Sequence, residues 1–255
     1  MRFADPDPLT LDPLDEGLRH LRAAEPDHEQ AVYWLRVAAD AGSVEGLALL
    51  GWCQLEGLGL PRDPIRARET LERASAEGSV LAKFNLARML VAGWGGAPDA
   101  PRGVALYTAA AAQGHADATF NLASCLDTGW GCHADRLGAK ALFLRARAMG
   151  SPLKAPGLRI RERELDAVRD LARRFEHGGD LAHLIEERQH EIALMHDLVH
   201  RPGRKPRLST RQRRHLLRLA SLTALAAGLA ATVASLLGWR SARAVAQDAG
   251  PTSIA

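Results

Sequence analysis

The chain has 255 residues, of which 47% are apolar, and its formal net charge at pH 7 is +3. This length and apolar content allow one or two domains with a buried core. Three cysteines in a chain of this length exclude a disulfide framework, so we expect a reducing compartment.

Charge is distributed unevenly along the chain. Residues 1–30 carry eight acidic residues against three arginines, whereas residues 201–218 carry eight basic residues and no acidic one. We interpret residues 1–8 as an acidic, disordered N-terminus. The opening stretch MRFADPDPLTLDPL is interrupted by proline and has no apolar core, so we expect no secretory signal peptide.

Residues 9–150 repeat with a period of 36, as a degenerate copy over 9–42 and full copies over 43–78, 79–114 and 115–150. The recurring columns are the glycines Gly42, Gly78, Gly114 and Gly150; the Gly-x-Gly pairs that begin at Gly57, Gly93 and Gly129; the aspartates Asp27, Asp63, Asp99 and Asp135; the large apolar residues Leu35, Leu71, Tyr107 and Phe143; and the small residues Ala38, Ala74, Ala110 and Ala146.

Each copy is predicted to form two helices. In the stretch LAKFNLARMLVAG (81–93) the apolar residues fall at helical spacing. The Gly-x-Gly pair ends this first helix, and the aspartate that follows N-caps the second. A single helical hairpin cannot bury its apolar face alone, so the copies must stack into an all-α solenoid.

The repeat pattern resembles the Sel1-like repeat, a relative of the tetratricopeptide repeat. Residues 84–114 and 120–150 carry the resemblance best, and 46–78 carry it moderately. The departures are Gly103, in place of the usual alanine, and Gly96 and Cys132, where valine is common. The resemblance implies a curved α/α solenoid that serves as a non-enzymatic scaffold or adaptor for other proteins.

The residues after the repeats, 151–200, are predicted to form an amphipathic helical hairpin that caps the solenoid. The segment 151–157 contains two prolines and a glycine and interrupts the repeat pattern. Of the two helices that follow, the first carries an apolar stripe of Leu165, Val168, Ala172 and Phe175, and the second covers 181–200. A short self-associating coiled coil is the alternative.

A basic juxtamembrane linker is predicted over 201–215, a transmembrane helix over 216–239 and a short tail over 240–255. The core of the span, 219–239, contains no charged residue. The basic residues before it place the repeats in the cytoplasm, in a tail-anchored arrangement that we assign to a bacterial inner membrane. The residues expected at the anionic membrane surface are Arg204, Lys205, Arg207, Arg211, Arg213, Arg214 and Arg218.

Three alternatives to this arrangement stay open: a buried soluble helix over 219–239, a nucleic-acid-binding linker, and an envelope-facing regulatory or assembly factor of opposite topology. No aromatic residue lies within the linker, so we expect no nucleic acid as a partner. The small residues Ala220, Ala224, Gly228 and Thr232 lie four apart and permit self-association in lipid, although an alanine-rich span explains them equally well.

No motif for catalysis was found, so we expect no catalytic residue, no cofactor and no metal site. The pairs Glu187/His190 and His196/His200 have helical ligand spacing, but a second helix with matching ligands is missing, and a solvated face explains them. Cys53 and Cys125 are expected in the core, and a disulfide between Cys125 and Cys132 is the alternative. An enzyme of the Sel1-like type is a further alternative, from the resemblance alone.

The partner-binding groove is expected around six aromatic residues: Tyr33, Trp34, Trp52, Trp94, Tyr107 and Trp130. Trp94 and Trp130 share one column in the loops that join the two helices of a repeat. Exposed aromatic side chains in such loops are suited to anchoring a protein or peptide, although packing against the next repeat is the commoner fate of such residues. The stretch GWGCHAD (129–135) is interpreted as the same turn and not as a metal site.

Overall fold

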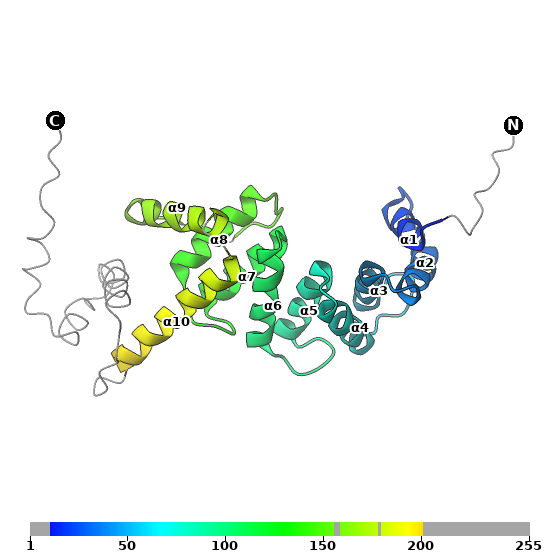
Figure 1. The fold of residues 1–255 in the computed structure, drawn as a ribbon, viewed down its shortest axis with the longest axis horizontal. Coiled ribbons are helices and arrows are strands. Elements are labelled where there is room, and N and C mark those ends of the chain that lie inside the picture. The colour runs from blue at the N-terminus through cyan, green and yellow to red at the C-terminus, as the bar shows by residue number, and fades with distance from the viewer. Residues whose placement is uncertain (1–10, 156–158, 178–179, 201–255) are drawn as a thin grey trace, which may run out of the picture. The chain divides into compact units, whose positions relative to one another are not determined.

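The computed structural model describes residues 11–155, 159–177 and 180–200, and these are all-helical, with no strand among them (Figure 1). The helices are α1 (Pro13–Arg22), α2 (His28–Asp40), α3 (Val44–Glu56), α4 (Pro64–Ala76), α5 (Val80–Ala92), α6 (Ala100–Ala112), α7 (Ala116–Thr128), α8 (Arg136–Ala148), α9 (Glu162–His177) and α10 (Leu181–His200). The described residues divide into two units, with the boundary between Ile185 and Glu186.

In the first unit each helix packs against the next one along the chain, from α1 to α9. The first helices of the repeats are α1, α3, α5 and α7, and the second helices are α2, α4, α6 and α8. In addition, α3 packs against α5. The solenoid predicted from the repeat is therefore confirmed for the described residues.

The second helix of every repeat is N-capped by the predicted aspartate. Asp27, Asp63, Asp99 and Asp135 each accept a backbone N–H from the first turn, at 2.9–3.1 Å. An N-cap satisfies amide donors that have no partner within the helix. The aspartate column is therefore confirmed as a helix-start signal.

The first helices α3, α5 and α7 are capped by a column that the sequence did not predict. Ser43, Ser79 and His115 lie one period apart, and each accepts a backbone N–H, from Gly46, Ala82 and Ala118, at 3.1–3.2 Å. His115 does so through its ring Nδ1 atom. A histidine thus performs the task that serine performs in the other two repeats.

The two glycines of each Gly-x-Gly pair have different roles. The first, for example Gly93, takes the left-handed conformation that ends the helix, with φ at 73°. The second, Gly95, has no space for a side chain, because an added Cβ would lie 2.2 Å from the carbonyl oxygen of Pro64. Gly59 and Gly131 contact the preceding repeat in the same way, at His28 and Ala100. Each loop therefore rests on the first turn of the preceding second helix.

The predicted core columns are buried. The four residues of the large column, Leu35, Leu71, Tyr107 and Phe143, and the four of the small alanine column are all buried. Cys53 and Cys125 are buried as predicted, with Met89 at the same repeat position between them. At the unusual Gly103 an added Cβ would lie 2.7 Å from Cγ2 of Val91, so an alanine there would force Val91 to shift.

Helix α9 packs against α8 and buries an apolar stripe there. Val168, Leu171 and Phe175 are its most deeply buried residues, whereas Leu165 and Ala172 are half-buried. Two cations of α8 hold its ends: Lys140 pairs with Glu164, and Arg145 donates to the backbone oxygen of Phe175 at 2.6 Å. The first residues of α10, up to Ile185, add to the same core.

Several predictions lie outside the described residues: the N-terminus 1–8, the basic linker, the span 216–239 with its row of small residues, and the tail. Within the described ranges, no helix combines the length and the apolar content needed to cross a bilayer. In the same ranges, no group of three or more His, Cys, Asp and Glu side chains is arranged to hold a metal ion.

Candidate protein-binding surface

The six aromatic residues predicted to bind a partner differ in how far they are exposed. Tyr107 is only 3% exposed and accepts a hydrogen bond from Asn121, so a partner cannot reach it in this structure. Tyr33 and Trp34 contact each other edge to face on α2, and Trp52 lies half-buried on α3. Tyr33 is 58% exposed, and Trp94 and Trp130 are exposed indoles at one repeat position.

Trp94 and Trp130 each follow the left-handed glycine that ends a first helix. Their backbone N–H groups donate to Met89 and Cys125, at 2.9 and 3.0 Å, and Leu58 makes the same bond in the preceding repeat. An apolar residue at this position normally packs onto the helix that it ends. Leu58 packs against the buried cluster around Cys53, whereas Trp94 is 36% exposed and Trp130 is 54% exposed. Part of the apolar surface of each indole is therefore left exposed to solvent and is available to a partner.

The loops that carry these indoles are held at several points. The N–H of Asp99 donates to Leu90 at 2.9 Å, and the N–H of Asp135 donates to Leu126 at 2.7 Å, so each loop is closed by its own repeat. Arg68, from the preceding repeat, donates to the carbonyl of Ala97 at 3.3 Å. We call Trp94, Trp130 and their two loops, residues 93–99 and 129–135, the loop-edge surface.

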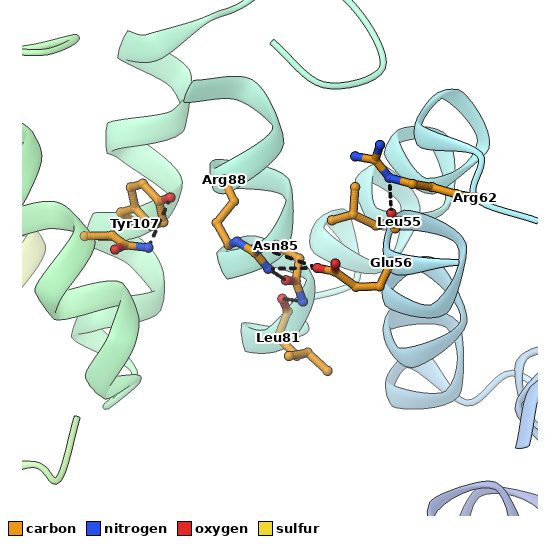
Figure 2. A network of polar contacts seen from close by, with 8 residues as sticks. Leu55, Glu56, Arg62, Leu81, Asn85, Arg88 and Tyr107 are labelled. Atoms are coloured by element: carbon orange, nitrogen blue, oxygen red, sulfur yellow. Dashed lines mark hydrogen bonds and ion pairs between the residues drawn. The ribbon is translucent and has the colours of Figure 1, made fainter. Parts of the chain in front are cut away.

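Arg88, Asn85 and Glu56 form a polar network (Figure 2), and the Arg88 side chain lies beside Trp94. The guanidinium of Arg88 lies 5.8 Å from the ring centroid of Phe84 and 5.6 Å from that of Trp94. It donates to Oδ1 of Asn85 at 3.1 Å, and to Oε1 of Glu56 on α3 at 3.4 and 3.5 Å. Asn85 is itself fixed, because it is buried and its amide donates to the carbonyl of Leu81.

Arg88 was not among the residues predicted from the sequence. It lies four residues after Phe84, which places both on one face of α5, and its repeat equivalents are Trp52 and Ser124. A cation at a position where the two neighbouring repeats have uncharged residues was the signal that could have identified it.

Beyond Phe84 the network reaches the histidine cap. The ring of His115 stacks on Phe84 with centroids 4.4 Å apart. Burial lowers the pKa of His115, and the nearby charge of Asp117 opposes this effect. The neutral form fits the structure, since Nδ1 must carry no proton if it is to accept from Ala118.

The thiols show no sign of chemical activation. All three cysteines are free, and burial raises the pKa of Cys53 and Cys132 to about 11 and that of Cys125 to about 12. Cys132 donates weakly through its Sγ to the carbonyl of Cys125 at 3.6 Å. Neutral, partly buried thiols of this kind act as packing groups.

A comparison with protein-family models matches most of the described repeats. The Sel1 repeat model matches residues 17–43, 44–79, 80–115 and 116–151, which together make up just over half of the chain. A search of curated proteins finds no significant match.

Two solved structures share the fold. A Sel1 repeat protein from Oxalobacter formigenes is 23% identical, with a TM-score of 0.51 over 66% of this chain and 61% of its own. The protective antigen c5321 of uropathogenic Escherichia coli, which displays an SLR fold, is 20% identical, with a TM-score of 0.50 over 89% of this chain and 44% of its own. The present chain thus spans less than two thirds of either protein.

Sel1 repeat proteins generally mediate protein–protein interactions and are typically non-enzymatic scaffolds. The four matched repeats and the shared helical architecture lead to one conclusion: the chain belongs to the Sel1 repeat family.

Proposed function

We propose that this chain is a scaffold that binds a protein partner at its loop-edge surface. The observation that carries the proposal is the exposure of Trp130, which is 54% exposed at a repeat position where Leu58 packs against a buried core cluster. Tryptophan is among the residues that contribute most to binding energy at protein interfaces. Two such residues at one repeat position, on loops that are held in place, form a preorganised binding edge.

We also propose that residues 216–239 anchor the scaffold in a membrane, with the repeats in the cytoplasm. The support is in the sequence: an uncharged run over 219–239, arginines at both ends, and eight basic residues before it against two after it. The envelope-facing factor of opposite topology is the second candidate. Reporter fusions at both ends separate the two, and a cytoplasmic C-terminal tail would contradict the proposed topology.

The binding proposal can be tested by crosslinking the full chain in membranes and recovering the attached proteins. We expect Trp94→Ala with Trp130→Ala to lose the crosslinked partner. Leu153→Ala is the matched control, because Leu153 is 44% exposed and follows α8, outside the loop-edge surface. If the double tryptophan variant recovers the same partner as the unaltered chain, the loop edge is not the binding surface.

A further inference from the structure

We infer that Arg88 binds a carboxylate of the partner, and that Glu56 occupies this position while the partner is absent. The inference rests on the proposed function, because it gives the chemistry of the segment that the loop-edge surface would hold. That segment is acidic, with apolar side chains that contact Trp94 and Trp130.

The pair between Arg88 and Glu56 is loose. Both contacts go to a single carboxylate oxygen, Oε1, and their lengths are 3.4 and 3.5 Å. A well-formed contact between a guanidinium and a carboxylate is about 2.7–2.9 Å long and often uses both oxygens. The side chains remain 29% and 38% exposed. An incoming carboxylate can therefore reach the guanidinium and form a better pair than Glu56 does.

The guanidinium is already held in position. Phe84 and Trp94 lie within cation–π distance of it, and the fixed carboxamide of Asn85 accepts one of its N–H groups. A guanidinium has five N–H donors in a planar arrangement, so donors remain for a ligand. Little side-chain freedom is lost when a ligand binds to a group that is restrained in this way.

The position of Arg88 selects the charge of the partner. Its guanidinium contacts Trp94 directly, so a side chain that reaches this indole also meets the positive charge. The equivalent residues in the neighbouring repeats are Trp52 and Ser124, which carry no charge. One repeat further along, Trp130 offers an apolar contact. The surface thus combines one cation with two indoles, which complements a carboxylate between apolar side chains.

A basic segment that pairs with Glu56 is the competing occupant, and one substitution separates the two. Glu56→Gln removes the internal competitor of an acidic ligand, so the affinity for an acidic ligand should rise about two- to fivefold, as expected for an exposed ion pair. The same change removes the counter-charge of a basic ligand, and the affinity for that ligand should fall.

The experiment selects displayed random 12-residue peptides on the full chain. The expected pool is enriched in Asp or Glu together with Leu, Phe or Trp. Clones from it should bind Glu56→Gln more tightly and Arg88→Met about tenfold more weakly, because methionine keeps the packing on Phe84 and Trp94 but removes the charge. Leu153→Ala should bind as the unaltered chain does, and circular dichroism verifies that each variant keeps its helix content.

The remaining outcomes count against one proposal or the other. A pool that lacks acidic enrichment, or clones that bind more weakly to Glu56→Gln, would overturn the role of Arg88. If such clones still need Trp94 and Trp130, the loop-edge surface stands and only the charge assignment fails. An empty pool, or clones indifferent to both tryptophans, contradicts the loop-edge surface itself.

Discussion

The cap at His115 makes the stability of the solenoid depend on pH. In the folded chain Nδ1 of His115 accepts the N–H of Ala118 at 3.2 Å, and a protonated ring cannot accept this bond. Burial lowers the pKa of His115 below its usual 6.5. The positive end of the α7 dipole also disfavours an imidazolium at this position. The folded chain therefore keeps His115 neutral to lower pH than the unfolded chain does.

The sign follows from this difference. Between the lowered pKa of the folded chain and 6.5, the unfolded chain binds more protons, so stability rises with pH. The contribution of His115 is therefore fully present above pH 6.5 and is lost as the pH falls through the folded-state pKa. Its size is that of an N-cap, about 0.5–2 kcal/mol.

The substitutions His115→Ser and His115→Ala test this cap. Serine caps the equivalent helices at Ser43 and Ser79, so His115→Ser should retain most of the stability at pH 7.5. His115→Ala should lose about 1 kcal/mol at that pH. Urea unfolding followed by circular dichroism, at pH 7.5 and pH 5, gives the free energies.

Subtracting the free energy of unfolding of His115→Ser from that of the unaltered chain cancels the contributions of all titrating groups that the two chains share. We expect the unaltered chain to lose stability relative to His115→Ser on going to pH 5. Equal pH dependence of the two chains, or an alanine variant as stable as the unaltered chain at pH 7.5, would refute the cap.

Three further predictions concern the repeat frame and the thiols. Gly95→Ala should lower the free energy of unfolding by more than about 2 kcal/mol, because its Cβ would meet Pro64 and its φ is 72°. Gly78→Ala, whose Cβ would have nothing within 4 Å, should lower it by about 1 kcal/mol, and similar losses for the two variants in urea unfolding would contradict the loop contact. Asp99→Ala should cost about 1 kcal/mol and Asp99→Ser much less, and equal losses in the same assay would count against the cap. Cys125, with its pKa raised to about 12, should react with iodoacetamide far more slowly at pH 7.5 in the folded chain than in urea, as read by mass spectrometry; equal rates would show that the thiol is accessible.

Features that depend on the repeat register were predictable from the sequence. The aspartate caps and the buried columns recur at fixed spacing, and local helix chemistry explains each of them. Tyr107 is an example. It lies in the same repeat column as the buried residues Leu35, Leu71 and Phe143, and its position in that column indicated burial better than its aromatic ring indicated a binding role.

Features that depend on contacts between repeats were not predictable. Gly95 looks like a helix stop in the sequence, and only the approach of Pro64, 31 residues earlier, shows its second role. The pair of Arg88 and Glu56 joins α5 to α3 across 32 residues, and no local pattern marks it. The cap at His115 was not predictable from the residue type, because histidine is not among the usual N-cap residues.

The contact between each loop and the preceding repeat limits how this chain can change in length. A residue inserted between Pro64 and Gly95 would displace the glycine from the carbonyl that it now touches, while the contacts at Gly59 and Gly131 would stay in place. Duplication or loss of a full 36-residue copy would restore every such contact. The close contact at one glycine per repeat therefore favours changes in the length of the solenoid by whole copies.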